Sequence, residues 1–197
     1  NEITKTTPAS FEPSIDYVVT KIPRFTFEKF STSEAVLGTS MKSVGEAMAI
    51  GRNFKESLQK ALVSLEIGFS GLDRIFPLNK KEIEKELKKN IPNRILLAAE
   101  AFRKKINIKR IHQLCKIDPW FLEQIKEIVN EENKIQKRGL PKDYNEFNRI
   151  KSIGFSDKKL SEITKISEDI VRKKRTALKV LPVYKKVDTC AAEFKSF

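Results

Sequence analysis

The sequence predicts a mainly α-helical protein with a small α/β part at its N-terminal end. Residues 15–27 are rich in β-branched and aromatic side chains, which favour strands. From residue 80 onward, apolar side chains recur three and four positions apart, which is the spacing of one helix face. Residues 67–78 have no clear period and contain glycines and a proline, so we expect a linker between two domains.

Two short strands and one helix are expected in residues 1–66. Prolines interrupt the first apolar run, so a strand there is short or lies at a sheet edge. Residues 31–40 are small and polar and predict a loop, and residues 47–50 predict a second short strand between two glycines. Asn53 is a natural N-cap. The helix that follows it has one apolar face, formed by Phe54, Leu58, Ala61, Leu62 and Leu65.

Start and stop signals define the helices after residue 80. Asp118 is expected to cap a helix whose first position is Pro119, where a missing N–H group breaks no helical hydrogen bond, and Gly139 ends that helix. Ser156 and Ser167 are expected to cap two further helices, Gly154 to end the helix before them, and Pro182 to end the helical region. The apolar positions of these helices include Phe147, Ile150, Ile170 and Val171. Residues 183–194 are expected to be extended chain.

Composition excludes several classes of protein. No apolar run approaches the roughly 20 residues that cross a bilayer, so we expect no membrane span. A single histidine excludes multi-histidine metal sites, and two cysteines are too few for a disulfide scaffold or a cysteine-rich zinc site. The chain opens at Asn1 without a Met, a basic region or an apolar signal region, so we expect it to be an excised segment.

The net charge of +13 divides unevenly along the chain. Residues 1–66 hold eight basic and eight acidic side chains, and the remaining residues hold 31 basic and 18 acidic ones. This excess raises the hypothesis of a nucleic-acid-binding module, because phosphate neutralisation drives such binding. The best candidate is the basic helix pair 156–178, which resembles a helix-turn-helix and carries Arg172 and Arg175. The favoured alternative is that the excess charge comes from lysines on solvated helix faces, because net charge bears on solubility and not on fold.

The remaining motifs predict no catalytic or metal site. His112 and Cys115 are three residues apart, but basic side chains surround them and nothing nearby completes a tetrahedral site. Cys190 lacks a histidine base. No glycine-rich phosphate loop is present. The acidic pairs Glu131-Glu132 and Glu168-Asp169 lie among lysines, so we expect them on outer helix faces.

Three stretches carry a more specific signal. They are TPASFEPSIDYVVTKIPRF (residues 7–25), MKSVGEAMAIGR (residues 41–52) and PVYKKVDTCAAEF (residues 182–194). Their order and spacing resemble the middle of the large subunit of carbamoyl phosphate synthetase. Residues 117–122 (IDPWFL) are similar to that family's motif at the same place, so the resemblance covers essentially the whole chain.

The resemblance implies three segments: residues 1–66 as the tail of the first ATP-grasp half, residues 67–181 as a helical oligomerisation domain, and residues 182–197 as the lead-in to the second half. It implies that the parent is a cytoplasmic ATP-dependent ligase that makes carbamoyl phosphate from bicarbonate and glutamine-derived ammonia for arginine and pyrimidine biosynthesis. ATP, Mg²⁺ or Mn²⁺, and K⁺ would bind the parent outside this segment. We therefore expect no catalytic, cofactor-binding or metal-binding residue here, and no activity in the isolated segment.

The resemblance also implies partners and one site residue. The partners are a small glutamine amidotransferase subunit and other large subunits. Glu46 is similar to a glutamate that lines the path of carbamate between the active sites, and the alternative is a carboxylate that pairs with Lys42 or Arg52. Trp120 and Phe121 are candidate anchors of the core or of an interface, with the core favoured because aromatic side chains usually pack inward.

Overall fold

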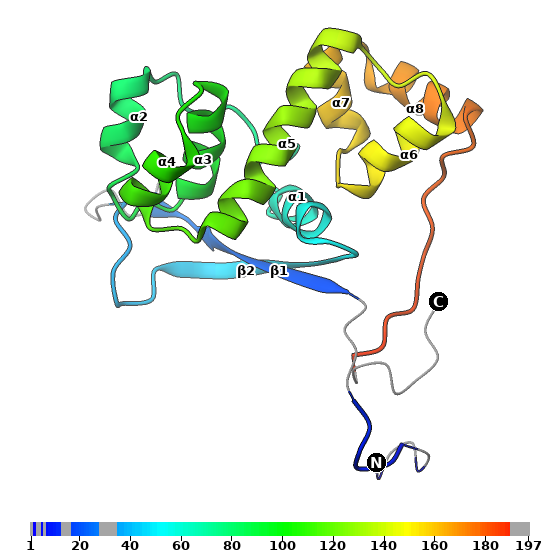
Figure 1. The fold of residues 1–197 in the computed structure, drawn as a ribbon, viewed down its shortest axis with the longest axis horizontal. Helices are drawn as coiled ribbons and strands as arrows, with labels where there is room; N and C mark the ends of the chain where they lie inside the picture. The colour runs from blue at the N-terminus through cyan, green and yellow to red at the C-terminus, as the bar shows by residue number, and fades with distance from the viewer. Residues whose placement is uncertain (1, 3–4, 6, 13–16, 28–34, 190–197) are drawn as a thin grey trace.

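The computed structural model of the chain describes residues 2, 5, 7–12, 17–27 and 35–189. A two-stranded sheet lies at the base, α1 lies against it, and the remaining helices stand above (Figure 1). The elements are β1 (Val18–Phe25), β2 (Ser43–Gly51), α1 (Phe54–Ser64), α2 (Lys80–Glu86), α3 (Arg94–Arg103), α4 (Ile108–Cys115), α5 (Pro119–Arg138), α6 (Tyr144–Ser152), α7 (Asp157–Thr164) and α8 (Glu168–Ala177). The predicted mainly α fold with a small α/β part is confirmed. We call α2–α8 the helical lobe.

The two strands form an antiparallel hairpin in which Val18 pairs with Gly51 and Pro23 pairs with Glu46. One face of the hairpin packs on α1, with Ala49 buried and with a hydrogen bond of 2.6 Å between the hydroxyls of Thr20 and Ser57. The opposite face is exposed. β2 is longer than the short strand predicted from residues 47–50, because pairing with β1 extends it across Gly45 to Ser43.

Three of the side-chain caps that the sequence predicts, Asn53, Asp118 and Ser156, are present. Asn53 Oδ1 accepts from the backbone N–H of Glu56 at 2.9 Å, and Asp118 Oδ1 accepts from that of Trp120 at 2.8 Å. Gly139 ends α5 with a φ of 80°. Ser167, a predicted cap that precedes α8, makes no capping hydrogen bond through its side chain, and neither does Asn93 before α3. The first backbone bond of α8, from Val171 N to the Ser167 carbonyl, is nevertheless present.

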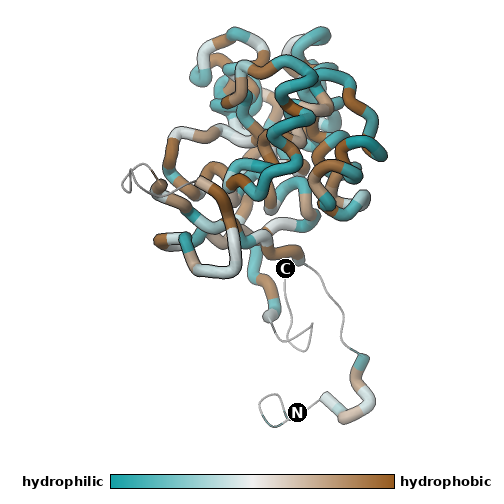
Figure 2. Tube along the Cα trace, turned by 90° about the vertical axis from the view of Figure 1, so that its left-hand side faces the viewer, coloured by the Kyte–Doolittle hydropathy of each residue, from teal (hydrophilic) through white to brown (hydrophobic). Residues whose placement is uncertain are grey.

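One contiguous hydrophobic core joins α1 to the helical lobe. It includes side chains of α1 together with those of the other helices, among them Leu58, Leu62, Leu96, Ile128, Phe147 and Val171. Along the helices the trace alternates between polar and apolar residues, as amphipathic helices around a core require (Figure 2). Ile170, predicted as an apolar helix position, is 54% exposed, because its neighbour Val171 occupies the inward position of α8.

The favoured core placement of Trp120 and Phe121 is wrong. Trp120 is 54% exposed and Phe121 is 42% exposed. The cause is helical periodicity, because Leu122 and Ile125 lie on the inward face of α5 and are fully buried, which leaves positions 120 and 121 outside. The two rings instead form a surface cluster with Phe54 of α1.

The chain leaves the helical lobe at Val180, whose side chain is buried in the core. Residues 181–189 then run as irregular extended chain away from the helices (Figure 1). Tyr184 in this segment is fully exposed. The prediction of extended chain is confirmed as far as residue 189, and its remainder, including Cys190, lies outside the described residues.

Candidate functional site

Glu46 lies on the exposed face of the hairpin, opposite the face that α1 covers. Its side chain is 49% exposed, and its Oε1 atom lies 2.9 Å from Nζ of Lys21 on the neighbouring strand. The two residues are diagonal neighbours, since Glu46 pairs with Pro23 in the strand register. The partners weighed from the sequence were Lys42 and Arg52, but Lys42 Nζ donates to the carbonyl of Val36.

A hollow of about 380 Å³ lies beside Glu46. Its lining combines the hairpin with the end of α1: Arg24, Thr26, Val44, Gly45, Glu46, Ala47, Ser64, Leu65 and Glu66. The charged residues among them are Arg24, Glu46 and Glu66.

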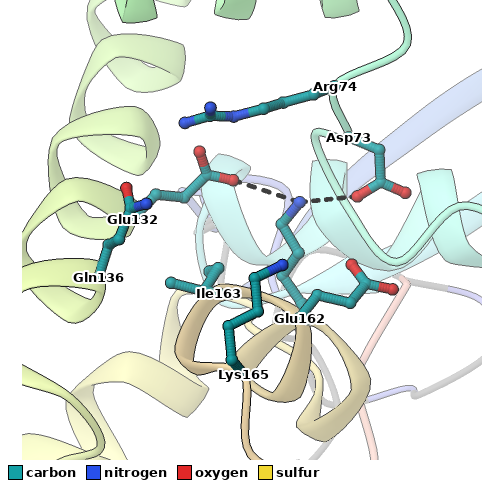
Figure 3. Close-up of a pocket in the computed structure, with 8 residues that line it drawn as sticks. Asp73, Arg74, Glu132, Gln136, Glu162, Ile163 and Lys165 are labelled. Atoms are coloured by element: carbon teal, nitrogen blue, oxygen red, sulfur yellow. Dashed lines mark hydrogen bonds and ion pairs between the residues drawn. The ribbon is translucent and has the colours of Figure 1, made fainter.

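A network of buried ion pairs joins the linker before α2 to α5 and α7. Lys159 Nζ lies 2.7 Å from Asp73 Oδ1 and 3.3 Å from Glu132 Oε1, and the lysine side chain is only 7% exposed. Figure 3 shows these two contacts as dashed lines among the side chains that line a cavity of about 320 Å³, which include Arg74 and Lys165. Lys159, Asp73 and Glu132 thus compensate one another's charges within this network.

Arg103 of α3 extends the network. Its guanidinium donates to Glu132 Oε2 from Nε at 2.9 Å and from Nη2 at 2.7 Å, and Nη2 also donates to the carbonyl of Leu72. Burial raises the pKa of Asp73, but hydrogen bonds from Lys159 and Ser70 outweigh this effect and hold the pKa below its ordinary value. Asp73 therefore stays ionised at neutral pH, and its contacts attach the linker to α7.

The prediction that Glu131 and Glu132 lie on outer helix faces is wrong. Both residues are 5% exposed, and Glu131 pairs with Arg149 at 2.5 Å and with Lys134 at 3.3 Å. Burial raises the pKa of Glu131, but these partners lower it below the ordinary value. A signal was present for Glu132, because it follows Ile128 by four residues and precedes Ile135 by three, on the buried face of α5.

The basic helix pair forms α7 and α8, but its arginines bind acidic groups of the same chain. Arg175 Nε lies 3.0 Å from Asp157 Oδ2, and its Nη1 donates to the carbonyl of Val180 at 2.7 Å. Arg172 pairs with Glu168 at 2.9 Å. Lys151 also binds Asp157, and the two cations hold the pKa of that carboxyl below its ordinary value despite its burial. The guanidiniums proposed for nucleic acid therefore have intramolecular partners.

His112 and Cys115 make contacts that stabilise the fold. His112 Nδ1 lies 2.8 Å from the carbonyl oxygen of Ile117, across the turn between α4 and α5, and Cys115 is buried in the core. Within the described residues, no group of three or more metal-ligating side chains comes together. None of the helices in that part of the chain combines the length and the apolar composition of a membrane span.

The surface aromatic cluster joins the first turns of α1 and α5. The ring centroids of Phe54 and Phe121 are 5.1 Å apart, and those of Trp120 and Phe121 are 5.0 Å apart with nearly perpendicular planes. Edge-to-face contacts of this kind are favourable because the ring edge is positive and the ring face negative. Nearby, Lys55 Nζ and Glu127 Oε2 form an ion pair of 2.5 Å between the same two helices.

The fold and these sites define a helical structural domain that carries a short β-hairpin. The sequence model for "Carbamoyl-phosphate synthetase large chain, oligomerisation domain" matches residues 46–179. The chain belongs to the carbamoyl phosphate synthetase large chain family.

Relatives named as large chains of carbamoyl phosphate synthase align with nearly all of the sequence. That of Brucella melitensis is 52% identical over 203 residues, which cover 100% of this chain and 18% of the relative. That of Haemophilus ducreyi is 53% identical over 190 residues, which cover 96% of this chain and 18% of the relative. An arginine-specific, chloroplastic large chain of Oryza sativa is 52% identical over 202 residues. The chain thus spans less than a fifth of the length of these relatives.

Proposed function

We propose that this chain is the central segment of a carbamoyl phosphate synthetase large chain, where it joins the two synthetase halves and mediates association between large chains. The observation that carries this proposal is the match of residues 46–179 to the oligomerisation domain of that family. The helical lobe, with its continuous core and its buried ion pairs, provides the rigid body that such a role needs.

The parent protein in this proposal is an ATP-dependent ligase. It makes carbamoyl phosphate from bicarbonate and ammonia, and a small amidotransferase subunit releases that ammonia from glutamine. ATP and its metal ions (Mg²⁺ or Mn²⁺, with K⁺) bind in other parts of the parent, which works in the cytoplasm. The Oryza sativa relative is named as arginine-specific, which supports a place in arginine biosynthesis as one use of the product.

Three segments make up the chain in this proposal. Residues 1–66 end the first ATP-grasp half, residues 67–181 form the oligomerisation domain, and residues 182–197 lead into the second half. The exposed face of the hairpin supports the first assignment, because Val44 and Met48 are apolar and more than half exposed there. Since α1 shares the core of the helical lobe, the boundary at residue 66 separates segments of one rigid body.

Glu46 is proposed to line the path of carbamate. Its half-exposed carboxylate beside a polar hollow supports this role, because a wall of hydrogen-bonding groups is what a polar, unstable intermediate needs.

Trp120 and Phe121 are proposed as interface anchors, since exposed aromatic rings in a fixed arrangement contribute strongly to protein interfaces. The nucleic-acid alternative is not favoured, because Arg172 and Arg175 bind Glu168 and Asp157.

A competition experiment tests the role in association. The isolated chain is added in large excess to the intact large chain, and the assembled species are weighed by mass photometry. We expect the higher oligomers of the intact protein to decrease, because the isolated chain occupies the same interface. An oligomer distribution that stays the same at every excess of chain would refute the proposal.

A second experiment tests where the active sites lie. We expect the isolated chain to show no bicarbonate-dependent hydrolysis of ATP in a phosphate-release assay. The intact large chain, assayed in parallel, is the positive control. Turnover by the isolated chain above the background without enzyme would overturn the proposed placement of the active sites outside it.

A further inference from the structure

Helix α1 is enclosed between the hairpin that carries Glu46 and the helical lobe (Figure 1). On the hairpin side, Ser57 and Thr20 bond through their hydroxyls, and Lys60 Nζ donates to the carbonyl of Ile50 at 3.2 Å. The start of α1 also touches the end of β2, since a Cβ atom on Gly51 would lie 2.8 Å from the backbone nitrogen of Ser57. The position of β2 is therefore tied to that of α1.

On the other side, two carboxamides of the α1 region bind consecutive carbonyls at the end of α6. Asn53 Nδ2 donates to the carbonyl of Ser152 at 3.1 Å, and Gln59 Nε2 donates to that of Ile153 at 2.8 Å. Gln59 is fully buried, and the two bonds connect residues more than 90 positions apart. We call residues 153–156, which join α6 to α7, the α6–α7 turn.

The close approach of α1 to the α6–α7 turn requires a glycine in the turn. Gly154 has a φ of +97°, and a Cβ atom on it would lie 3.0 Å from Cβ of Gln59 and 3.0 Å from Cα of Glu56. Gly71, in the linker, has its Cα beside Oε1 of Gln59 in the same way, with 2.9 Å to an added Cβ. The side chain of Gln59 thus lies between two glycine turns, where no larger residue leaves room for it.

The α6–α7 turn is held from the linker as well. Ser156 Oγ donates to the carbonyl of Ser70 at 3.2 Å, and the same serine caps α7. A displacement of this turn therefore moves α1, and a displacement of α1 moves β2. The contacts form a continuous path from the helical lobe to the strand of Glu46.

We propose that Gln59 is a positioning residue: its bond to Ile153 fixes α1, and with α1 the strand that carries Glu46, onto the helical lobe. Assembly through the helical lobe would then set where Glu46 lies. This inference rests on the proposed function for the roles of Glu46 and of the lobe. The contact itself stands on the geometry of Gln59, Ile153 and Gly154.

The test replaces Gln59 by methionine, which keeps the volume of the side chain and removes its hydrogen-bonding groups. The matched control is Gln113→Met on the exposed surface of α4. Hydrogen exchange of the 197-residue chain is followed by mass spectrometry. We expect Q59M to exchange about tenfold faster in peptides covering β2 and the α6–α7 turn, while α4 and the middle of α5 keep their protection.

A measurement of global stability distinguishes a positioning role of Gln59 from a general structural role. Gln59 Oε1 is buried without a hydrogen-bond partner in the described part of the chain. Q59M leaves the Ile153 carbonyl without this donor but also removes the unpartnered oxygen, and because these two effects oppose each other we expect the urea midpoint of unfolding to change little. Unchanged exchange in β2 and in the turn, or an equal rise in all peptides, would overturn the positioning role.

The intact large chain then tests the link to Glu46. We expect Q59M to raise the ratio of ATP hydrolysed to carbamoyl phosphate formed by about twofold or more, and Q113M to leave it unchanged. An unchanged ratio in a Q59M protein with faster local exchange would refute the role of Glu46 and the link to it, while the contact would stand.

Discussion

Lys159 and Asp73 are 86 residues apart in the sequence, yet the ammonium of the first lies 2.7 Å from a carboxylate oxygen of the second in the interior of the protein. This ion pair attaches the linker to α7, and the bond of Lys159 to Glu132 attaches both to α5. Buried pairs of this kind specify one arrangement of elements, because removing one partner leaves the other charged group buried without compensation.

Lys159→Met is therefore expected to destabilise the chain by about 3 kcal/mol. The change leaves Asp73 and Glu132 with fewer partners in a site that water hardly reaches. The free energy of unfolding is measured by urea denaturation followed by circular dichroism. Lys158→Met is the matched control, because Lys158 is exposed and its one bond, to the carbonyl of Gly68, is long at 3.4 Å. Equal effects of the two changes would contradict the importance assigned to the network.

Asp157 predicts a pH dependence of stability. Lys151 and Arg175 lower the folded pKa of this carboxyl below its ordinary value of 3.8, so the folded state loses a proton more readily than the unfolded state. The resulting stabilisation is complete above the unfolded pKa and is lost as the pH falls through the folded one. We expect the urea midpoint to fall steeply below about pH 4, and less steeply in Asp157→Asn.

Asp169→Asn is the control for this pH dependence, because Asp169 is 81% exposed. Its urea midpoint is expected to follow that of the unmodified chain at every pH. If the urea midpoint of Asp157→Asn fell as steeply below about pH 4 as that of the unmodified chain, Asp157 and its two cations would not contribute to stability in acid.

The surface aromatic cluster predicts different effects on stability and association. Trp120→Ala is expected to lower the free energy of unfolding by only about 1 kcal/mol, because the side chain is half exposed. Phe147→Ala, at a fully buried position, is expected to lower it by about 4 kcal/mol. If Trp120 is an interface anchor, W120A weakens self-association at least about tenfold by sedimentation. Association that survives W120A intact would assign the interface to another surface.

Gly154 and Gly68 both have a positive φ, and comparing them tests how much the close contact of Gly154 with α1 matters for stability. Gly154→Ala places a methyl group against α1, whereas Gly68→Ala, with a φ of +93°, places one in open space. Both changes strain the backbone by about 1 kcal/mol, and the first adds the displacement of α1. We expect G154A to lower the melting temperature clearly more than G68A. Equal melting temperatures would show that α1 and the α6–α7 turn are not in tight contact.

Local signals in the sequence predicted local structure well. Asn53 and Asp118 act as caps and Gly139 as a stop because each satisfies backbone groups within a few residues. The resemblance of three stretches predicted the family, which the whole-chain matches then showed.

Long-range contacts escaped prediction. Glu131 and Glu132 were assigned to outer faces because lysines surround them in sequence, but their partners Arg149 and Arg103 come from other helices. Trp120 was assigned to the core from its residue type, although the face of α5 that lies inward begins at Leu122. The apolar spacing of α5 did mark its inward face, but the arginines that pair with Glu131 and Glu132 come from other helices, and the sequence of α5 does not identify them.

We propose that this chain carries the association surface of a large chain, and sedimentation equilibrium of the isolated 197-residue protein measures whether it self-associates. We expect a weight-average mass that rises with concentration from 22.7 kDa toward twice that value or more. A mass that stays at that of the single chain at every concentration up to the solubility limit would contradict it.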